Sequence, residues 1–196
     1  MDRNRELVAL EVAALDRHLP AGHALVALLD GAGAEDVMVV PDTLAWITTG
    51  WNLSFSPSLG AVDALIASGR LAQIENSQLR LGLAGLRDLF NDALEEELSA
   101  RQIVIEQIAP LLGARMQLDY DIGAEFFGHR GPGLTPQERV RDLPLTSHGS
   151  VEFPTDLRVR NAIVFRLGWL TSARSEFDLM QPHLRDLSEM VAEEIR

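Results

Sequence analysis

The chain has 196 residues, of which 46% are hydrophobic but only 6% aromatic, so one domain with an aliphatic core is the default expectation. Its 17 basic and 29 acidic side chains leave a net charge of −12, which argues against nucleic acid or anionic lipid as a partner. The absence of cysteine excludes disulfides, thiolate metal sites and thiol nucleophiles. We therefore expect a single all-α domain over residues 1–196, without a cofactor.

The N-terminal residues 2–19 are predicted to form a helix with the apolar stripe Leu7, Leu10, Ala14 and Leu15. Pro20 and Gly22 should break or kink this helix, and a second helical piece should end near Asp30. The following run "VMVVPD" is a short apolar segment to which we assign no strand. Asp42 is expected to cap a short helix that ends at Gly50.

The segment "FSPSLGAVDALIASGRLAQIENSQLR", residues 55–80, predicts a corner between two helices. Ser56 is suited to cap a helix that starts at Pro57, and Gly69 to end it in the left-handed conformation. Arg70 is expected to neutralise the carbonyls at that helix end or to pair with Asp63 or Glu75. The candidate structural or partner-binding residues of this corner are Asp63, Ser68, Gly69, Arg70 and Asn76.

Two long helices are predicted to form the spine of an elongated bundle, with the N-terminal helix as third member. The first starts at Asn76 or Ser77 and has the seam Leu79, Leu83, Leu86, Phe90, Leu94, Leu98, Ile105, Ile108 and Leu112. The second opens near residue 156 and has the stripe Val159, Ile163, Leu167, Leu170, Ala173, Phe177, Met180, Leu184, Leu187 and Val191. Residues 113–154 between them are rich in glycine and proline and are predicted to be a loop-rich connection.

Several polar patterns are interpreted as structural. The acidic run Asp88, Asp92, Glu95, Glu96 and Glu97 is expected to be a solvated face, although its spacing would suit a hard cation. The five histidines have no zinc-site spacing, and "GHRGPG" at 128–133 lacks the ending of a phosphate-binding loop. Ser147 and His148 lie on no nucleophile elbow. The three tryptophans, at 46, 51 and 169, are expected to anchor the core.

The phrase "FSPSLGAVDALIASGRLAQIENSQLRLGLAGL", followed by "EEELSARQIVIEQIAPLL", resembles an uncharacterised bacterial family. Its members have one N-terminal transmembrane helix, a Phe-x-Pro segment, a helix ending in Ser-Gly-Arg, then Ile-x-Asn and a long acidic helix. The resemblance covers residues 55–112, is weaker over 156–195 and is absent between them. The matching positions are Phe55, Pro57, Asp63, Ser68, Gly69, Arg70, Leu71, Ile74 and Asn76.

The resemblance implies a membrane anchor that this sequence does not contain, and it implies no activity. Three explanations are open: the sequence is a piece of a longer protein, its start codon was placed too late, or it is a soluble member of the family. We favour the first. We expect a non-enzymatic helical scaffold or interaction module that docks a protein partner or another copy of itself. The alternatives are a ligand- or ion-sensing domain that uses residues 113–154 near Arg70, and a hydrolase.

Overall fold

A computed structural model describes residues 2–32, 36–49, 55–113 and 149–194. The described part is mostly helical, as predicted, with a small two-stranded sheet. The elements in chain order are α1 (Asp2–Gly31), β1 (Val37–Pro41), α2 (Asp42–Thr49), α3 (Gly60–Ala67), the 3₁₀ helix η1 (Arg70–Gln73), α4 (Ser77–Ile103), the π-helix η2 (Val104–Ile108), α5 (Ala109–Gly113), β2 (Ser150–Pro154) and α8 (Leu157–Glu194).

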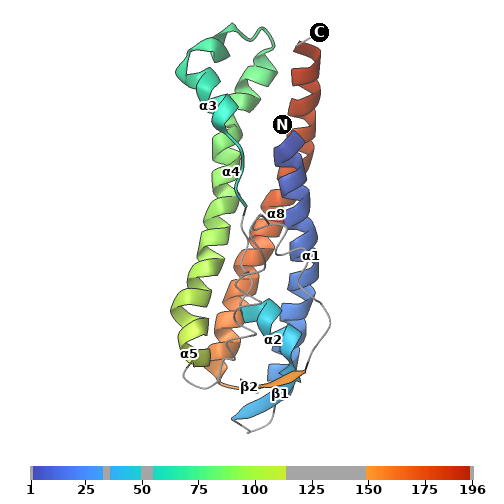
Figure 1. The fold of residues 1–196 in the computed structure, drawn as a ribbon, viewed down its shortest axis with the longest axis vertical. Coiled ribbons are helices and arrows are strands. Elements are labelled where there is room, and N and C mark those ends of the chain that lie inside the picture. Colours follow the sequence, from blue (N-terminus) through green and yellow to red (C-terminus); the bar gives the residue numbers. More distant parts are fainter. Residues whose placement is uncertain (1, 33–35, 50–54, 114–148, 195–196) are drawn as a thin grey trace, which may run out of the picture.

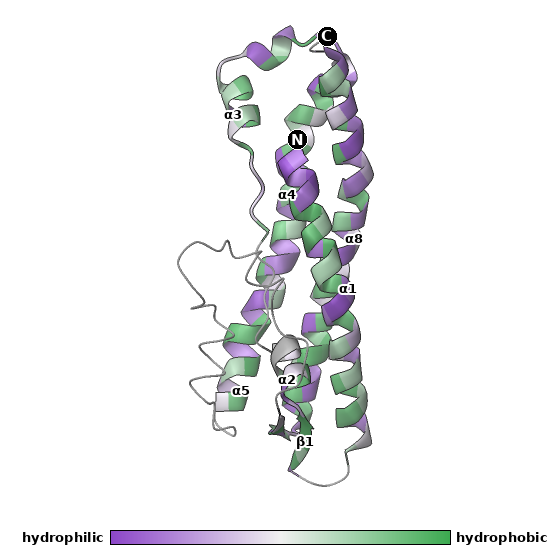
Figure 2. Cartoon of the chain, turned by 45° about the vertical axis from the view of Figure 1, so that its right-hand side comes forward, coloured by the Kyte–Doolittle hydropathy of each residue, from purple (hydrophilic) through white to green (hydrophobic). Residues whose placement is uncertain are grey.

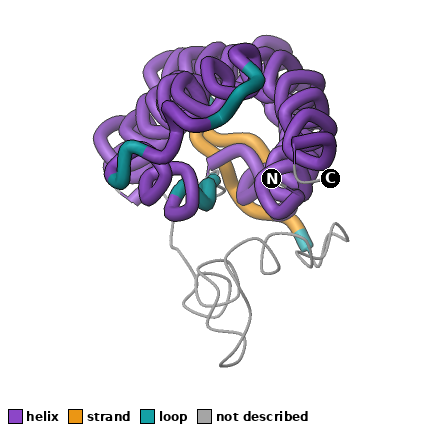
Figure 3. Tube along the Cα trace, turned by 90° about the horizontal axis from the view of Figure 1, so that it is seen from above, coloured by secondary structure: helices purple, strands orange, loops and turns teal. Residues whose placement is uncertain are grey.

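Three long helices, α1, α4 and α8, form an elongated bundle (Figure 1). The two helices predicted as the spine, α4 and α8, pack along one another. Helix α8 also packs along α1, whereas α1 and α4 make few direct contacts. Seen from above, the helices therefore form an arc with the strand pair on its inner side (Figure 3).

Helix α1 is continuous through Pro20, so the predicted break is wrong. Proline removes one backbone hydrogen bond and clashes with the preceding turn, but packing against α8 on both sides of Pro20 holds the helix together. Gly22 is buried because α8 comes close there: a Cβ at this position would overlap the side chain of Leu167. The sequence signal for a helix stop is thus a site of close helix packing.

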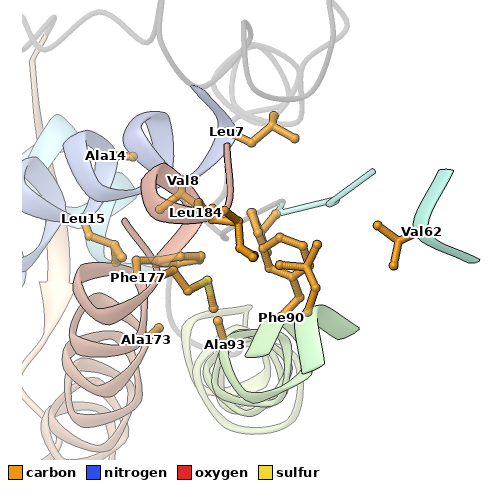
Figure 4. Packing of buried hydrophobic residues seen from close by; sticks show 14 of the residues in the cluster. Leu7, Val8, Ala14, Leu15, Val62, Phe90, Ala93, Ala173, Phe177 and Leu184 are labelled. Carbon is orange, nitrogen blue, oxygen red and sulfur yellow. The ribbon is translucent and has the colours of Figure 1, made fainter. Parts of the chain in front are cut away.

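The core has two hydrophobic clusters, one towards each end of the bundle. Helix α8 contributes to both, and its predicted stripe is confirmed, with nine positions buried and Val191 partly buried. The first cluster joins residues 7–15 of α1, residues 79–100 of α4 and residues 170–187 of α8 (Figure 4). The second joins residues 25–29, 103–112 and 159–167 with Val40 and Phe153 of the strands.

The predicted seam of the α4 region is confirmed from Leu79 to Phe90 and again at Ile108 and Leu112. Between these two parts Leu94 is half-buried, while Leu98 and Ile105 are 57% and 61% exposed. The buried positions are instead Ala93, Glu97, Ala100 and Ile103. The π-turn of η2 adds one residue to the helical repeat, which returns Ile108 and Leu112 to the core.

The run "VMVVP" forms the short strand β1, which pairs antiparallel with β2 from the segment predicted to be loop-rich. Val37 lies opposite Pro154 and Pro41 opposite Ser150. Helix α2 follows β1 directly, and the carboxylate of Asp42 accepts a hydrogen bond from the backbone N–H of Thr43. The two strands belong to segments more than 100 residues apart, so no local pattern could have revealed their pairing.

Candidate functional site

Residues 55–59 form no helix, so the prediction of a helix capped by Ser56 and starting at Pro57 is wrong. The chain before Leu59 runs along the bundle as an extended segment (Figure 1). Helix α3 starts at Gly60, after Leu59, and no side chain caps it. The cause is tertiary: the backbone of Ser58 exchanges two hydrogen bonds with the buried side chain of Asn4, at 2.8 and 3.0 Å. This fixes the extended segment to α1.

Phe55 occupies the space that α1 and α4 leave between them. Its ring makes edge-on contacts with Phe90 of α4 and Phe177 of α8, at centroid distances of 5.5 and 5.0 Å. All three rings are buried, and Phe90 and Phe177 lie at the centre of the first hydrophobic cluster (Figure 4). The aromatic of the Phe-x-Pro segment is therefore a core residue that closes the bundle.

Glu97 is buried, which contradicts the prediction that the whole acidic run is solvated. Its carboxylate accepts a hydrogen bond from the backbone N–H of Phe55 at 3.2 Å and forms an ion pair with Arg101 at 2.8 Å. Burial raises the pKa of Glu97, while the contacts with Arg101 and Phe55 act in the opposite direction. Glu97 thus holds the start of the extended segment in place.

Glu96 lies at the contact between α4 and α8 and is half-buried. Desolvation raises its pKa, and the negative charges of Glu176, Glu95 and Asp92 raise it further. Asp88, Asp92 and Glu95 are exposed, as predicted. Within the described ranges, no three histidine, aspartate or glutamate side chains are placed to hold a metal ion.

Three of the five candidate residues of the corner, Ser68, Gly69 and Asn76, shape the local backbone. Gly69 has φ +71°, which confirms the left-handed helix stop. Asn76 caps α4 by accepting hydrogen bonds from the N–H groups of Gln78 and Leu79, as predicted. The hydroxyl of Ser68 donates to the carbonyl of Ala64 at 2.7 Å.

The predicted ion pair of Arg70 is wrong. Asp63 pairs instead with Arg87 of α4, at 2.6 Å, and so fastens α3 to α4. Among the described residues Arg70 forms no salt bridge and is exposed. Gly69 and Arg70 face solvent while Asp63 turns towards α4, so the five corner residues do not point towards a common site.

The structure reveals an exposed apolar face on α8 that the stripe analysis did not predict. Phe165 is 66% exposed and Trp169 40%, so the expectation of a core role for Trp169 is wrong; Trp51 and the side chain of Trp46 lie outside what the structure describes. Leu157, Val164 and Leu179 are exposed on the same helix. These five residues, which we call the outer face of α8, point away from its buried stripe.

Charge is distributed unevenly along the bundle. We call residues 2–16, 55–97 and 176–194 the terminal half, and residues 17–31, 36–49, 98–113 and 149–175 the strand half. The terminal half carries 17 acidic and six basic side chains, the strand half six of each. Hydrophobic stretches are correspondingly prominent on the lower parts of α1 and α8 (Figure 2). The outer face of α8 lies mainly in the neutral half.

The strand half contains two buried basic side chains that the sequence did not mark. Arg166 of α8 is 2% exposed and donates from Nη1 to the carbonyl of Thr48; burial lowers the pKa of its guanidinium to about 9. His18 hydrogen-bonds the carbonyl of Ala14, and its pKa is lowered to about 4, mainly by burial and further by Arg17 and Arg166. Arg166 is charged at neutral pH and His18 is neutral.

The glycine-rich "GHRGPG" run, Ser147 and His148 lie outside the described residues. None of the helices in the described ranges has the length and apolarity needed to cross a bilayer. Comparisons with family models, curated proteins and solved structures gave no match. The family resemblance of residues 55–112 therefore remains a prediction.

Proposed function

We propose that this protein is a non-enzymatic helical module whose role is to bind another protein chain. The observation that carries the proposal is the outer face of α8, where two aromatic and three aliphatic side chains are exposed on one rigid helix. Exposed apolar groups that lie close together mark binding surfaces more often than scattered ones do. Aromatic residues are also enriched among those that dominate binding energy.

The remaining features of the chain support a scaffold. The buried polar side chains with described contacts hold the fold together: Asn4 binds Ser58, Glu97 binds Phe55, and Arg166 binds Thr48. The groove between α1 and α8, which includes Arg5, Asp178 and Pro182, is open and lies at the surface. A wide, solvated groove of this kind is unlike the enclosed apolar pockets that hold small ligands.

Site-specific photocrosslinking in the native host tests this proposal. A benzophenone amino acid in place of Phe165 is expected to form a covalent adduct with another polypeptide, because the partner would cover that position. The matched control carries the same group in place of Leu81, which is 71% exposed on α4 and lies off the outer face of α8. If position 165 gives no adduct, or no more than position 81, the proposal fails.

The family resemblance adds that the module is held at a membrane by a segment outside this sequence. The coding DNA upstream of the first codon provides the test. An in-frame apolar run of about 20 residues would support a single transmembrane helix. If that DNA encodes no such run, the anchor is removed from the proposal and the binding role is unaffected.

A further inference from the structure

A regular row of seven positions runs along α8 on the side opposite its buried stripe, and three of them, Leu157, Val164 and Leu179, belong to the outer face of α8. Its members are separated by intervals of four, three, four, four, three and four residues, which keeps them on one side of the helix. Six are exposed and Asn161 is half-exposed. The row consists of Leu157, Asn161, Val164, Gly168, Ser172, Ser175 and Leu179.

The residues near the centre of this row have small side chains, and those at its two ends have large ones. Among the described residues, no atom lies within 4 Å of a Cβ built at Gly168, so they leave the backbone of α8 open to close approach there. Ser172 and Ser175 are small and exposed as well. Phe165 and Trp169 lie together on one flank of this low centre, where they would contact the side of a helix that packs into it.

The same stretch is free of negative charge. Residues 157–175 contain no aspartate or glutamate, although the chain has 29 acidic side chains. Three of its four arginines pair with acids of the chain: Arg158 with Asp156, Arg160 with Asp30, and Arg174 with Asp16. The fourth, Arg166, is buried. The surface here is close to neutral, so it attracts neither a strongly acidic nor a strongly basic partner.

We propose that the partner of this face is a second copy of the chain, packed antiparallel with the two-fold axis at Gly168. This inference rests on the proposed function and names its partner. Two copies that each carry the acidic terminal half repel one another in most orientations. An antiparallel pair joined at its neutral segments places those halves at opposite ends of the dimer, where the repulsion is smallest.

The row has the symmetry that such a dimer requires. In an isologous pair, a residue that contacts a second residue in the partner is contacted by that same residue in return. With the axis at Gly168, Leu157 of one copy lies opposite Leu179 of the other, because both are 11 positions from the axis. Val164 likewise lies opposite Ser172. Each exposed leucine then gains an apolar neighbour, and the two glycines meet at the axis.

Sedimentation equilibrium tests the association. The chain has a mass of 21.6 kDa, and the wild type is expected to give twice that value at high concentration, with association strengthened by salt because salt screens the acidic halves. Phe165→Glu and Ser172→Glu should each shift the protein to monomer while helicity and melting temperature stay unchanged. Ser172 is exposed and polar, so its variant tests the face even if Phe165→Glu folds poorly.

The control for charge alone is Leu81→Glu, which adds the same group at an exposed apolar position of α4. It should remain dimeric. A wild type that is monomeric throughout, or a Leu81→Glu variant that dissociates as readily as Ser172→Glu, overturns the proposal. If the wild type is monomeric and position 165 crosslinks to a different protein in cells, this inference falls and the proposed function stands.

Disulfide trapping tests the orientation, because the chain has no cysteine of its own. Gly168→Cys should crosslink to itself, and a mixture of Leu157→Cys and Leu179→Cys should give the mixed dimer. Neither leucine variant should crosslink alone, since in the antiparallel pair the two copies of position 157 lie about 33 Å apart, far beyond the ~7 Å that a disulfide spans. Self-crosslinking of Leu157→Cys would indicate a parallel pair and overturn the proposed arrangement.

Discussion

The terminal half and the strand half of the bundle use the same three helices, yet they place charged groups in opposite ways. The terminal half has a strongly acidic surface and buries the carboxylate of Glu97 against Phe55. The strand half has a neutral surface and buries the basic side chains of Arg166 and His18. The apolar groups differ as well: Phe55 is buried in the first half, whereas Phe165 is exposed in the second.

This contrast divides the rod of helices into two regions that differ in surface charge and in packing. In the terminal half a separate segment without helix or strand, residues 55–59, fills the space between α1 and α4. The acidic surface there opposes association, because like charges repel. In the strand half the described residues are neutral overall and lack that repulsion, which is the reason that we propose the binding face of α8 there.

The largest change in the free energy of unfolding should come from removing the aromatic ring that is buried in the terminal half. Phe55→Ala is expected to lower the free energy of unfolding by about 3–5 kcal/mol, because it removes a buried ring that touches two others. Chemical denaturation of the monomeric Ser172→Glu background measures this. Phe165→Ala is the matched control and should change stability by less than about 0.5 kcal/mol. Similar costs for the two variants would contradict the division into halves.

Buried His18 of the strand half predicts a loss of stability in acid. The pKa of His18 is about 4 in the folded chain against 6.5 for a free histidine, so between these values the unfolded state binds more protons. The free energy of unfolding should therefore fall as the pH is lowered from 6.5 to 4, by on the order of 3 kcal/mol. Denaturation measured at several pH values gives the slope, and His18→Gln should remove this component.

Glu97, the buried acid of the terminal half, provides a second test, because its protonation should change the stability in the opposite direction. The pKa of Glu97 is raised in the folded chain, so the folded state binds the proton more tightly than the unfolded state does. Acidification through the pH range in which Glu97 titrates should therefore increase the free energy of unfolding. Comparing wild type with Glu97→Gln isolates that contribution, since glutamine still accepts the hydrogen bond from Phe55 without a charge. A wild type with no more acid sensitivity than His18→Gln would contradict the placement of His18.

The smallest predicted effect concerns two glycines within long helices. Gly22→Ala should destabilise by about 1–3 kcal/mol, because its Cβ would overlap the buried side chain of Leu167. Gly85→Ala should stabilise by up to about 1 kcal/mol, since no atom of the described ranges lies within 4 Å of a Cβ at this position and alanine favours the helix. Thermal unfolding of both variants measures the difference. Equal shifts would show that α1 and α8 are less closely packed at Gly22.

Much of the fold could be predicted because its signals are local. The stripe of α8, the left-handed Gly69 and the cap at Asn76 each depend on residues within a few turns, and all three are confirmed. The lower seam of α4 could not be predicted in this way. Leucines at 94 and 98 outweighed Ala93 and Ala100 in the pattern, but close approach of α8 favours the small residues there.

The position of the candidate site was even harder to predict from local sequence patterns. The sequence placed it at the 55–76 corner, where the motif is dense, but the contacts there serve capping and packing. Phe165 and Trp169 form part of the exposed face, and exposure depends on what α1 and α4 leave uncovered. A helix with apolar residues on more than one side does not itself say which side is buried.

The amino-acid sequence alone determined the helical class, the long helices, the corner glycine and the overall negative charge, because periodicity, turn chemistry and composition act over short range. Only the tertiary structure decided that Pro20 lies within a helix, that residues 37–41 and 150–154 pair, and that Phe55 closes the core. Each of these depends on a partner far along the chain, whose packing energy outweighs the local preference.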